Sequence, residues 1–466
     1  MRAALALVAV ALVAVPAADA YRNPTPGKAV VLQISGMHRA KVKRGIVYLR
    51  SPRLRMDVYR PQKARGRLPA VLLAGPSARR SGQKVGWSQL IAASGLSAVA
   101  FDTRSDASPR NPALDVQSAL VYVRSHAKRL GIDPNRLCTL GFSAPWHLWA
   151  TMRDPQRWLR CNVAYYEPLD FQSAGLGDEF SALADLRRSP RSIPPMLVVG
   201  AGRDDSVDRF QAAAADLHAD VRVVAYPEAG PGFDVGPRTA RARVIVQQTL
   251  RFLKARLARP LPVTESCATG AERASALRFF ASDDTPLVGL VVGSGPRGVV
   301  LAHGQNGDFC EWLPYARELA TAGYRVFAYD ARGYGLRVDL DMAAAIEALR
   351  RTGSPHVIAM GSSMGAIAAL IGSASLPSAP AAVVSLSAPA SYGPLNALPA
   401  VARLRSPTFF AASELDEPFV GDARALYAAS AAPEKYLEIL PGGVHGSDML
   451  HDAGFRSRVE AFIAAH

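Results

Sequence analysis

The chain has 466 residues, which is too long for one ordinary domain and predicts two or three domains with enough sequence to bury their cores. A composition of 49% hydrophobic and 20% charged residues is typical of a globular protein and excludes a largely disordered one. The net charge of +15 comes largely from arginines scattered along the chain, so it indicates a solubilising surface and no nucleic-acid partner, with weak attraction to anionic cell-surface polymers left open.

The N-terminus has the features of a secretory signal peptide. Arg2 supplies a positive charge, residues 3–15 form a short apolar run, and Ala18-Asp19-Ala20 offers small residues before a cleavage point at Tyr21. Because the run is short for a bilayer span, we expect cleavage and no stable membrane insertion afterwards, with an uncleaved anchor as the alternative. The expected location is the periplasm, the cell surface or the medium.

Export also affects the interpretation of the four cysteines, because disulfides persist outside the cytoplasm. Four cysteines allow three pairings, and we expect nearest neighbours to pair within each half of the chain, Cys138 with Cys161 and Cys267 with Cys310. The sequence has neither a C-x-x-C spacing nor a His/Cys cluster. We therefore expect no metal site and no cofactor.

The first half alternates strand-like and helical stretches from about residue 46 to residue 257, which favours a mainly parallel sheet with helices on both faces. The expected strands are residues 46–50, 70–74, 97–102, 136–140, 162–166, 196–201 and 221–226. The expected helices include residues 113–130, 207–217 and 240–256.

Residues 258–275 interrupt this alternation with Pro260, Pro262 and Gly270, and are predicted to be a linker. The alternation then returns. The expected strands are residues 298–302, 324–330, 356–360, 382–386, 407–411 and 435–440, and the expected helices are 312–322, 339–351, 364–373, 421–430 and 457–464. The sequence thus predicts a signal peptide (1–20), a first α/β domain (21–257), the linker and a second α/β domain (276–466), a duplication of architecture without close sequence similarity.

The motif Gly361-Ser362-Ser363-Met364-Gly365 lies between an expected strand and an expected helix of the second domain. In a G-x-S-x-G turn the serine is lifted above the strand ends, and Gly361 and Gly365 permit the close backbone approach that the turn requires. The alternative is that Ser363 only caps the helix.

A serine hydroxyl becomes a good nucleophile when a histidine takes its proton and a carboxylate orients that histidine. Asp416 follows the expected strand 407–411, and His445 stands in the glycine-rich loop 441–446. We favour Asp416 because it lies one turn beyond the strand end. The nearby alternatives are Glu414, Glu417 and Asp422 for the acid, and His451 for the base.

The reaction also needs N–H donors for the developing oxyanion. Met364, directly after the serine, is one candidate, and Gln305 in His303-Gly304-Gln305 is the other. His303 is expected to pack and hydrogen-bond beneath this loop and not to titrate in the reaction.

With Ser, Asp and His in this order, residues 276–464 resemble the α/β-hydrolase superfamily. Leu301-Ala302-His303-Gly304 and Tyr329-Asp330-Ala331-Arg332-Gly333-Tyr334-Gly335 resemble the His-Gly and Asp-x-Arg-Gly-x-Gly segments of its esterases and acyl hydrolases. The resemblance implies the fold and ester-type acyl transfer, and it leaves the substrate open.

The first half resembles the same superfamily, nearer to its secreted esterase and dienelactone-hydrolase-like branches. Leu140-Gly141-Phe142-Ser143-Ala144-Pro145 occupies the place of the serine turn, and Asp204 that of the acid. Three prolines depart from the pattern: Pro145 replaces the second glycine, Pro76 has no N–H to donate, and Pro231 stands where the histidine belongs. His147 and His218 are not obviously within reach of Ser143. We therefore expect a degenerate domain kept for packing, cell-wall contact or ligand contact.

The predicted function is that of a secreted serine hydrolase acting on carboxylic esters, with Ser363, Asp416 and His445 as its triad. Residues 388–405 are too few for a cap domain, which predicts an open site for small or polymer-attached esters. A thioesterase, amidase or peptidase would use the same triad. A non-catalytic binding or scaffold protein built from two hydrolase folds is the alternative of another class, and the oligomeric state is left open.

Overall fold

The computed structural model describes residues 30–104, 110–156, 158–170, 180–332 and 337–466. The predicted signal peptide and Gly333, Tyr334 and Gly335 of the Asp-x-Arg-Gly-x-Gly segment lie outside these ranges. The chain divides into two compact units, each treated separately below. The first comprises the chain up to Asp185 with Pro194–Gln211 and Val221–Leu257, and the second comprises Leu186–Ile193, Ala212–Asp220 and Ala258–His466. Within the described ranges, no helix is both long enough and apolar enough to span a bilayer.

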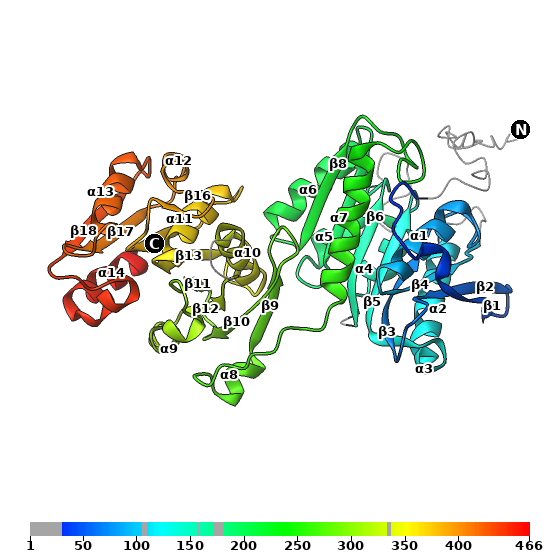
Figure 1. The fold of residues 1–466 in the computed structure, drawn as a ribbon, viewed down its shortest axis with the longest axis horizontal. Helices are drawn as coiled ribbons and strands as arrows, with labels where there is room; N and C mark the ends of the chain where they lie inside the picture. The colour runs from blue at the N-terminus through cyan, green and yellow to red at the C-terminus, as the bar shows by residue number, and fades with distance from the viewer. Residues whose placement is uncertain (1–29, 105–109, 157, 171–179, 333–336) are drawn as a thin grey trace, which may run out of the picture. The chain divides into compact units, whose positions relative to one another are not determined.

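The first unit is built on an eight-stranded sheet of order β1-β2-β4-β3-β5-β6-β7-β8 (Figure 1). Its first three strands in this order pair antiparallel, and all the others pair parallel. The strands are β1 (Lys41–Leu49), β2 (Leu54–Arg60), β3 (Leu68–Leu73), β4 (Ser97–Phe101), β5 (Ile132–Phe142), β6 (Leu159–Tyr165), β7 (Met196–Ala201) and β8 (Val221–Tyr226). The helices are α1 (Gly82–Ala93), α2 (Arg110–Ser125), α3 (Ala127–Leu130), α4 (Trp146–Met152), α5 (Ala182–Arg188), α6 (Asp205–Asp216) and α7 (Ala240–Leu257). The last residues of α5 and α6, 186–188 and 212–216, are assigned to the second unit.

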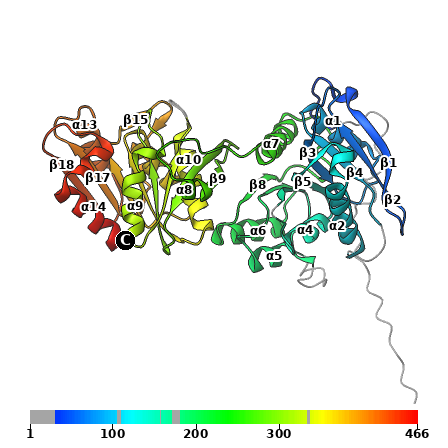
Figure 2. The same cartoon turned by 90° about the horizontal axis from the view of Figure 1, so that it is seen from below.

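Two hydrophobic cores lie on opposite faces of this sheet, because neighbouring residues of a strand point to opposite sides. Val71 and Leu73 of β3 join the core under α1 and α7. Ala70 and Leu72 join the other core, under α2 and α4. The two-sided cover of the sheet is visible in Figure 2.

The second unit repeats this plan with an eight-stranded sheet of order β18-β17-β14-β13-β11-β12-β10-β9. Here β12, β10 and β9 pair antiparallel and the others pair parallel. The strands are β9 (Ala276–Phe280), β10 (Pro286–Val292), β11 (Arg297–Ala302), β12 (Arg325–Asp330), β13 (His356–Ser362), β14 (Ala382–Leu386), β17 (Thr408–Ser413) and β18 (Lys435–Leu440). The helices are α8 (Gly270–Ala274), α9 (Leu313–Thr321), α10 (Val338–Arg351), α11 (Met364–Ser375), α12 (Leu398–Val401), α13 (Phe419–Ala429) and α14 (Ala453–Ala465).

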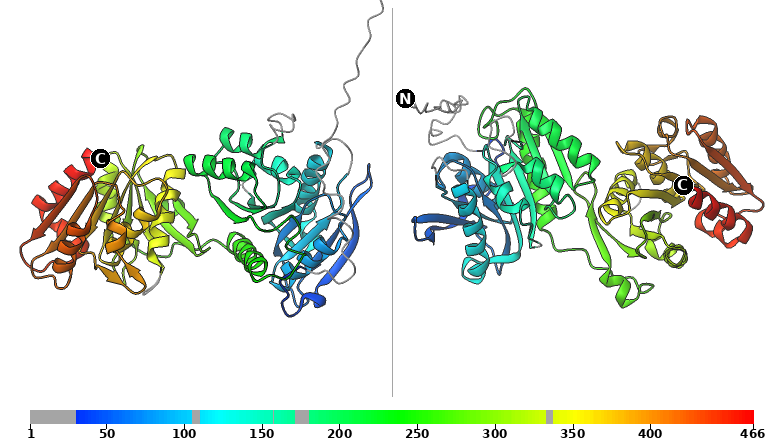
Figure 3. Two further views of the ribbon diagram at one scale, coloured as in Figure 1. Left: turned by 90° about the horizontal axis from the view of Figure 1, so that it is seen from above. Right: turned by 180° about the vertical axis from the view of Figure 1, so that it is seen from behind.

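This sheet also separates two cores. Helices lie on both of its faces (Figure 3). Val300 and Ala302 of β11 face the core shared with α10 and α11. Val299 and Leu301 face the core shared with α9 and α14. The predicted class, two tandem mainly parallel α/β domains, is confirmed.

The sequence rules missed strands that pair antiparallel. β2, β9 and β10 were not among the expected strands, because an α/β alternation predicts parallel strands joined by helices and takes no account of hairpins. Asp57 also interrupts the apolar run of β2, although the structure buries this side chain completely. The expected helix 113–130 is divided into α2 and α3.

The segment predicted to be a linker is partly folded. Thr269 and Glu272 form a reciprocal capping box at the start of α8, and Arg317 pairs with Glu272 at 2.8 Å. Cys267 forms a disulfide with Cys310 of the short 3₁₀ helix Phe309–Glu311. These contacts attach α8 to the second unit.

The second disulfide joins Cys138 to Cys161, which face each other on the paired strands β5 and β6 with their Cα atoms 4.7 Å apart. Both bonds follow the nearest-neighbour pairing predicted from the sequence.

Residues 388–405 form a small two-stranded sheet, β15 (Ser391–Tyr392) with β16 (Leu395–Asn396), followed by α12. This segment was predicted as a long loop. It has local structure, but it is far smaller than a cap domain.

Candidate active site

The turn at Ser363 joins β13 to α11 in a strained conformation. Ser363 has φ 51° and ψ −113°, a region that side-chain-bearing residues rarely adopt. A Cβ on Gly361 would collide with the backbone of Gly365, and one on Gly365 would collide with the carbonyl group of Ala302. The backbone N–H of Ser363 donates to the Leu386 carbonyl oxygen at 2.8 Å. Close packing therefore holds the serine at the carboxyl ends of the parallel strands.

Asp416 and His445 form a direct pair. Asp416 follows β17 and His445 follows β18, and the histidine Nδ1 lies 3.0 Å and 2.8 Å from the two carboxylate oxygens. Asp416 is only 9% exposed and accepts a further hydrogen bond from Ser387 Oγ at 2.8 Å. The ring of Phe419 packs against the imidazole at 4.5 Å between centroids. With Nδ1 engaged by the carboxylate, Nε2 is the nitrogen left for proton transfer.

The alternative acids and base are placed elsewhere. Asp422 accepts a hydrogen bond from the Ala390 backbone N–H at 3.0 Å. His451 has a side chain that is 86% exposed and lies 3.9 Å from Asp448. Among the alternatives considered from the sequence, the structure thus pairs Asp416 with His445.

The histidine loop is attached to the serine turn through neighbouring residues. Ser447 N–H donates to Ser362 Oγ at 3.1 Å, and Gly446 N–H donates to Ser387 Oγ at 3.0 Å. No hydrogen bond joins Ser363 Oγ to His445 in the described part of the chain. Such bonds are often long in unliganded sites and tighten when substrate binds.

The loop after β11 lies against the serine. A Cβ added to Gly304 would lie 3.6 Å from the Cβ of Ser363. The Gly304 N–H is occupied by Glu311 Oε2 at 2.8 Å, whereas the N–H of Gln305 has no partner among the described residues. Met364 is the first residue of α11, where backbone N–H groups have no helical acceptor. Both predicted oxyanion donors are therefore available.

His303 is a structural residue of this loop. It is 4% exposed, its Nε2 accepts from Ala331 N–H at 3.0 Å, and its Nδ1 lies 2.7 Å from the Gly304 carbonyl oxygen. Both ring nitrogens are occupied, so His303 has none free for substrate.

The first unit keeps the strained turn, and the histidine on the helix that follows it is buried. Ser143 has φ 60°, and its N–H donates to the Tyr165 carbonyl oxygen at 3.0 Å, as the N–H of Ser363 does to Leu386. Pro145 precedes α4 as its N-cap residue. His147 is fully buried 3.4 Å from Glu167, and burial lowers the pKa of this imidazole to about 3. It is therefore out of contact with solvent and poorly suited to take a proton.

A cavity of about 500 Å³ lies beside the carboxyl end of β7 in the first unit. Asp204 and Pro231, the residues at the acid and histidine positions, both line it, together with Tyr166 and Arg203. No histidine is among the described residues that line this cavity. That this unit lacks a general base stays a prediction.

Each unit contains an equivalent scaffold of hydrogen bonds between the loops that follow two neighbouring parallel strands. In the first, Asp102 accepts from Arg79 N–H at 2.9 Å, and Arg104 N–H donates to Asp115 at 2.8 Å. In the second, Asp330 accepts from Phe309 N–H at 2.9 Å, and Arg332 N–H donates to Asp341 at 2.8 Å. The Asp-x-Arg segment therefore anchors the loop after the preceding parallel strand in both units.

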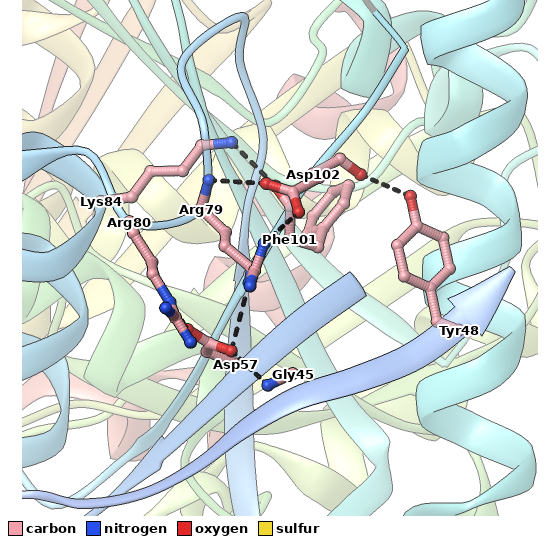
Figure 4. A network of polar contacts seen from close by, with 8 residues as sticks. All are labelled: Gly45, Tyr48, Asp57, Arg79, Arg80, Lys84, Phe101 and Asp102. Atoms are coloured by element: carbon pink, nitrogen blue, oxygen red, sulfur yellow. Dashed lines mark hydrogen bonds and ion pairs between the residues drawn. The ribbon is translucent and has the colours of Figure 1, made fainter. Parts of the chain in front are cut away.

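The scaffold of the first unit also contains a buried lysine (Figure 4). Lys84 of α1 is completely buried, and its Nζ donates to the Phe101 carbonyl oxygen at 3.0 Å and to the Gly75 carbonyl oxygen at 3.2 Å. Burial lowers the pKa of Lys84 to about 7, with Asp102 opposing the shift. This ammonium group fixes the loop that carries Pro76.

Several residues of the second site were missed from the sequence. They have no motif of their own and act through contacts formed only in the fold: Glu311, Ser362, Ser387, Phe419 and Ser447. The described residues contain no group of three or more His, Cys, Asp or Glu side chains placed to hold a metal ion.

Family models match both halves of the chain. Residues 299–461 match the Alpha/beta hydrolase family, and residues 56–157 match the family described as BD-FAE. No curated protein sequence matches the chain significantly. These family matches identify the chain as an α/β-hydrolase superfamily protein with two domains, and they support a hydrolase.

Two esterases are among the solved structures to which the chain is similar. Thermogutta terrifontis esterase 2 phosphoramylated by tabun is 22% identical, with a TM-score of 0.38 over 46% of this chain and 92% of that chain. The Pyrococcus furiosus esterase Pf2001 is 18% identical, with a TM-score of 0.38 over 45% of this chain and 97% of that chain.

Proposed function

We propose that this protein is an exported serine hydrolase that cleaves carboxylic esters through an acyl-enzyme formed on Ser363. The observation that carries the proposal is the pairing of His445 Nδ1 with Asp416, in a loop whose next two residues are bonded to Ser387 and Ser362. Because Nδ1 is engaged by the carboxylate, Nε2 is left for proton transfer, in a loop bonded to Ser362, the neighbour of Ser363. A histidine so oriented is what a serine hydroxyl needs to become a nucleophile.

In the proposed reaction, Ser363 Oγ attacks the ester carbonyl carbon while His445 Nε2 takes the hydroxyl proton. The carbonyl π electrons move to oxygen, and the N–H groups of Gln305 and Met364 stabilise the resulting oxyanion. When the intermediate collapses, the C–O bond to the alcohol breaks and His445 returns the proton to the leaving oxygen. Water then attacks the acyl-enzyme by the same steps, which releases the acid and regenerates Ser363.

The substrates proposed are small or polymer-attached esters. Between β14 and β17 the second unit carries only β15, β16 and α12, so this connection supplies no domain to enclose a long acyl chain. A series of p-nitrophenyl esters tests this directly. Highest kcat/KM for the shortest acyl groups is expected, and strong preference for long chains would refute an open site.

A fluorophosphonate probe tests the enzyme class. Labelling is expected in the wild type and in Ser143→Ala, and no labelling in Ser363→Ala. Ser143 is the matched control because it occupies an equivalent strained turn without a base. Absence of labelling in the wild type would support the non-catalytic scaffold instead. Matched ester, thioester and amide substrates of one acyl group then separate an esterase from a thioesterase, amidase or peptidase.

Export is the remaining part of the proposal. Expression of the full chain should place the mature protein outside the cytoplasm, with Tyr21 as its N-terminal residue by mass spectrometry. Retention of residues 1–20 on an exported protein would indicate an anchor, and a cytoplasmic full-length product would contradict export.

A further inference from the structure

One carboxylate in the second unit joins two loops that carry different parts of the proposed chemistry. Glu311 Oε2 accepts the N–H of Gly304, in the loop that presents Gln305, at 2.8 Å. Its Oε1 accepts from Ser447 Oγ, two residues after His445, at 2.9 Å. The same serine donates its N–H to Ser362 at 3.1 Å. Glu311 is therefore the direct connection between the oxyanion loop and the histidine loop.

Glu311 is itself held firmly at the end of a short 3₁₀ helix. Phe309 N–H donates to Asp330 at 2.9 Å, and the Phe309 side chain is completely buried. Cys310 is tied to Cys267 by the disulfide, and Trp312 on the other side of Glu311 is buried. The carboxylate thus projects from a segment that is anchored by its own contacts with Asp330 and Cys267.

The oxyanion loop packs closely against this carboxylate at Gly307. A Cβ on Gly307 would lie 2.8 Å from Glu311 Oε2, closer than real contacts allow. The Gly307 N–H donates to the Gly304 carbonyl oxygen at 3.2 Å, which closes the turn. Glu311 thus occupies the Gly304 N–H, whereas the next N–H along the chain, that of Gln305, has no partner among the described residues.

We infer that Glu311 is a positioning residue that fixes the oxyanion loop and the histidine loop relative to each other during acyl transfer. The inference rests on the proposed serine hydrolase function. Hydrogen bonds to an ionised carboxylate are stronger than neutral ones, so both loops are held in one geometry before substrate arrives. Donors that are already oriented stabilise the oxyanion without reorganisation, and a small displacement of such groups is costly.

Substitution of Glu311 should therefore act on the transition state and spare ground-state binding. Glu311→Leu removes both acceptors and is expected to lower kcat by about 10- to 100-fold, within the range seen when supporting residues of a site are removed. KM should change by less than about threefold, since Glu311 contacts loops and not the substrate. Glu311→Gln can still accept from Gly304 and donate to Ser447 Oγ, so it should recover most of the loss.

The experiment measures kcat and KM of the full chain with each rate divided by the concentration of active sites, titrated with the fluorophosphonate. The variants are Glu311→Leu, Glu311→Gln, Ser447→Ala and the Glu311→Leu/Ser447→Ala double substitution. Glu318→Leu is the matched control, because Glu318 lies in α9 of the same unit and pairs with Arg456 at the surface. Affinity for a trifluoromethyl ketone, which forms a tetrahedral adduct with the serine, is measured alongside.

The expected result is a parallel fall in kcat/KM and in ketone affinity for Glu311→Leu, a smaller fall for Ser447→Ala, and no further loss in the double variant. Unchanged kcat per titrated site in Glu311→Leu would overturn the inference, since a purely structural residue would reduce only the amount of active protein. If Glu311→Leu does not fold, the same criterion applies to Ser447→Ala, which leaves the oxyanion loop unaltered in sequence.

The proposed function can fail in a distinguishable way. If the wild type shows no labelling that depends on Ser363, the hydrolase proposal is wrong and the catalytic role of Glu311 falls with it. If labelling is normal and kcat is insensitive to Glu311, only the positioning role is wrong. Hydrogen exchange adds a readout independent of activity, because peptides covering residues 303–308 and 444–449 should lose protection together in Glu311→Leu.

Discussion

Ser387 Oγ donates a hydrogen bond to Asp416 and accepts one from the N–H of Gly446, the residue after His445. One hydroxyl group at the end of β14 thus joins the acid of the candidate triad to the loop of its base. Its bond reaches Asp416 Oδ2, the same carboxylate oxygen that lies 2.8 Å from His445 Nδ1. The geometry of the candidate triad therefore depends on Ser387 as well as on the triad residues themselves.

Removing this hydroxyl should weaken the site. Ser387→Ala leaves the buried Asp416 with one hydrogen bond fewer and the Gly446 N–H unpaired, and each loss costs about 1 to 3 kcal/mol. We expect kcat to fall about tenfold and the melting temperature to fall by a few degrees. Ser385→Ala is the control, because Ser385 lies on the same strand with a buried Oγ that has no partner in the described structure. Equal effects of the two substitutions would contradict the role of Ser387.

Asp416→Asn tests the orientation of His445. The amide is nearly the same size as the carboxylate, but its NH₂ group donates a hydrogen bond and cannot accept one from Nδ1–H, so the imidazole is expected to adopt the wrong tautomer. We expect kcat to fall by about three to four powers of ten with little change in stability. Steady-state kinetics with p-nitrophenyl acetate measures the loss. Asp422→Asn, a nearby acid outside the pair, should retain activity, and comparable losses in both variants would refute the assignment of Asp416.

The lowered pKa of the buried Lys84 predicts that the stability of the protein depends on pH. The pKa of this side chain is 10.5 in an unfolded chain and about 7 when buried in the folded one. Between these values the unfolded state binds more protons, so the contribution of Lys84 makes folding more favourable as the pH rises from about 7 towards 10. Lys84→Met should reduce the gain in unfolding free energy between pH 7 and pH 9.5 by about 2 to 3 kcal/mol.

Urea unfolding of the wild type and Lys84→Met at both pH values measures this difference. Lys84→Met also loses the hydrogen bonds to Gly75 and Phe101. This loss lowers the unfolding free energy by the same amount at both pH values, so it cancels when the change with pH is compared between the two proteins. Parallel pH profiles for the two proteins would show that Lys84 does not titrate in this range.

The disulfide between Cys267 and Cys310 should matter more for activity than the other one. It closes a separation of 43 residues, and removing it with Cys267→Ala/Cys310→Ala should destabilise the second unit by roughly 4 kcal/mol. Because Cys310 precedes Glu311, kcat should fall as well. Cys138→Ala/Cys161→Ala is the control, since that bond lies between β5 and β6 of the first unit. Loss of activity in the control alone would contradict this assignment.

The sequence by itself predicted much of the fold, because buried parallel strands and their helices have strong local signals. Four strands, β7, β8, β14 and β18, have the expected bounds. The hairpin strands β2, β9 and β10 were missed, since antiparallel pairing at the side of a sheet depends on a partner and not on the α/β alternation. The short helix α8 was missed because its stabilising contacts come from Arg317 and the Cys267 disulfide, both distant along the chain.

For the site, the sequence predicted Ser363, Asp416 and His445, with alternatives left for the acid and the base, because a strained turn needs glycines and the chain order limits the partners. Only the tertiary structure joined Asp416 to His445, left Asp422 and His451 elsewhere, and buried His147 away from solvent. It also decided the supporting residues Glu311, Ser387 and Ser447. Their roles come from hydrogen bonds between loops that follow different strands. These loops are far apart along the chain, so no local sequence pattern predicts the contacts between them.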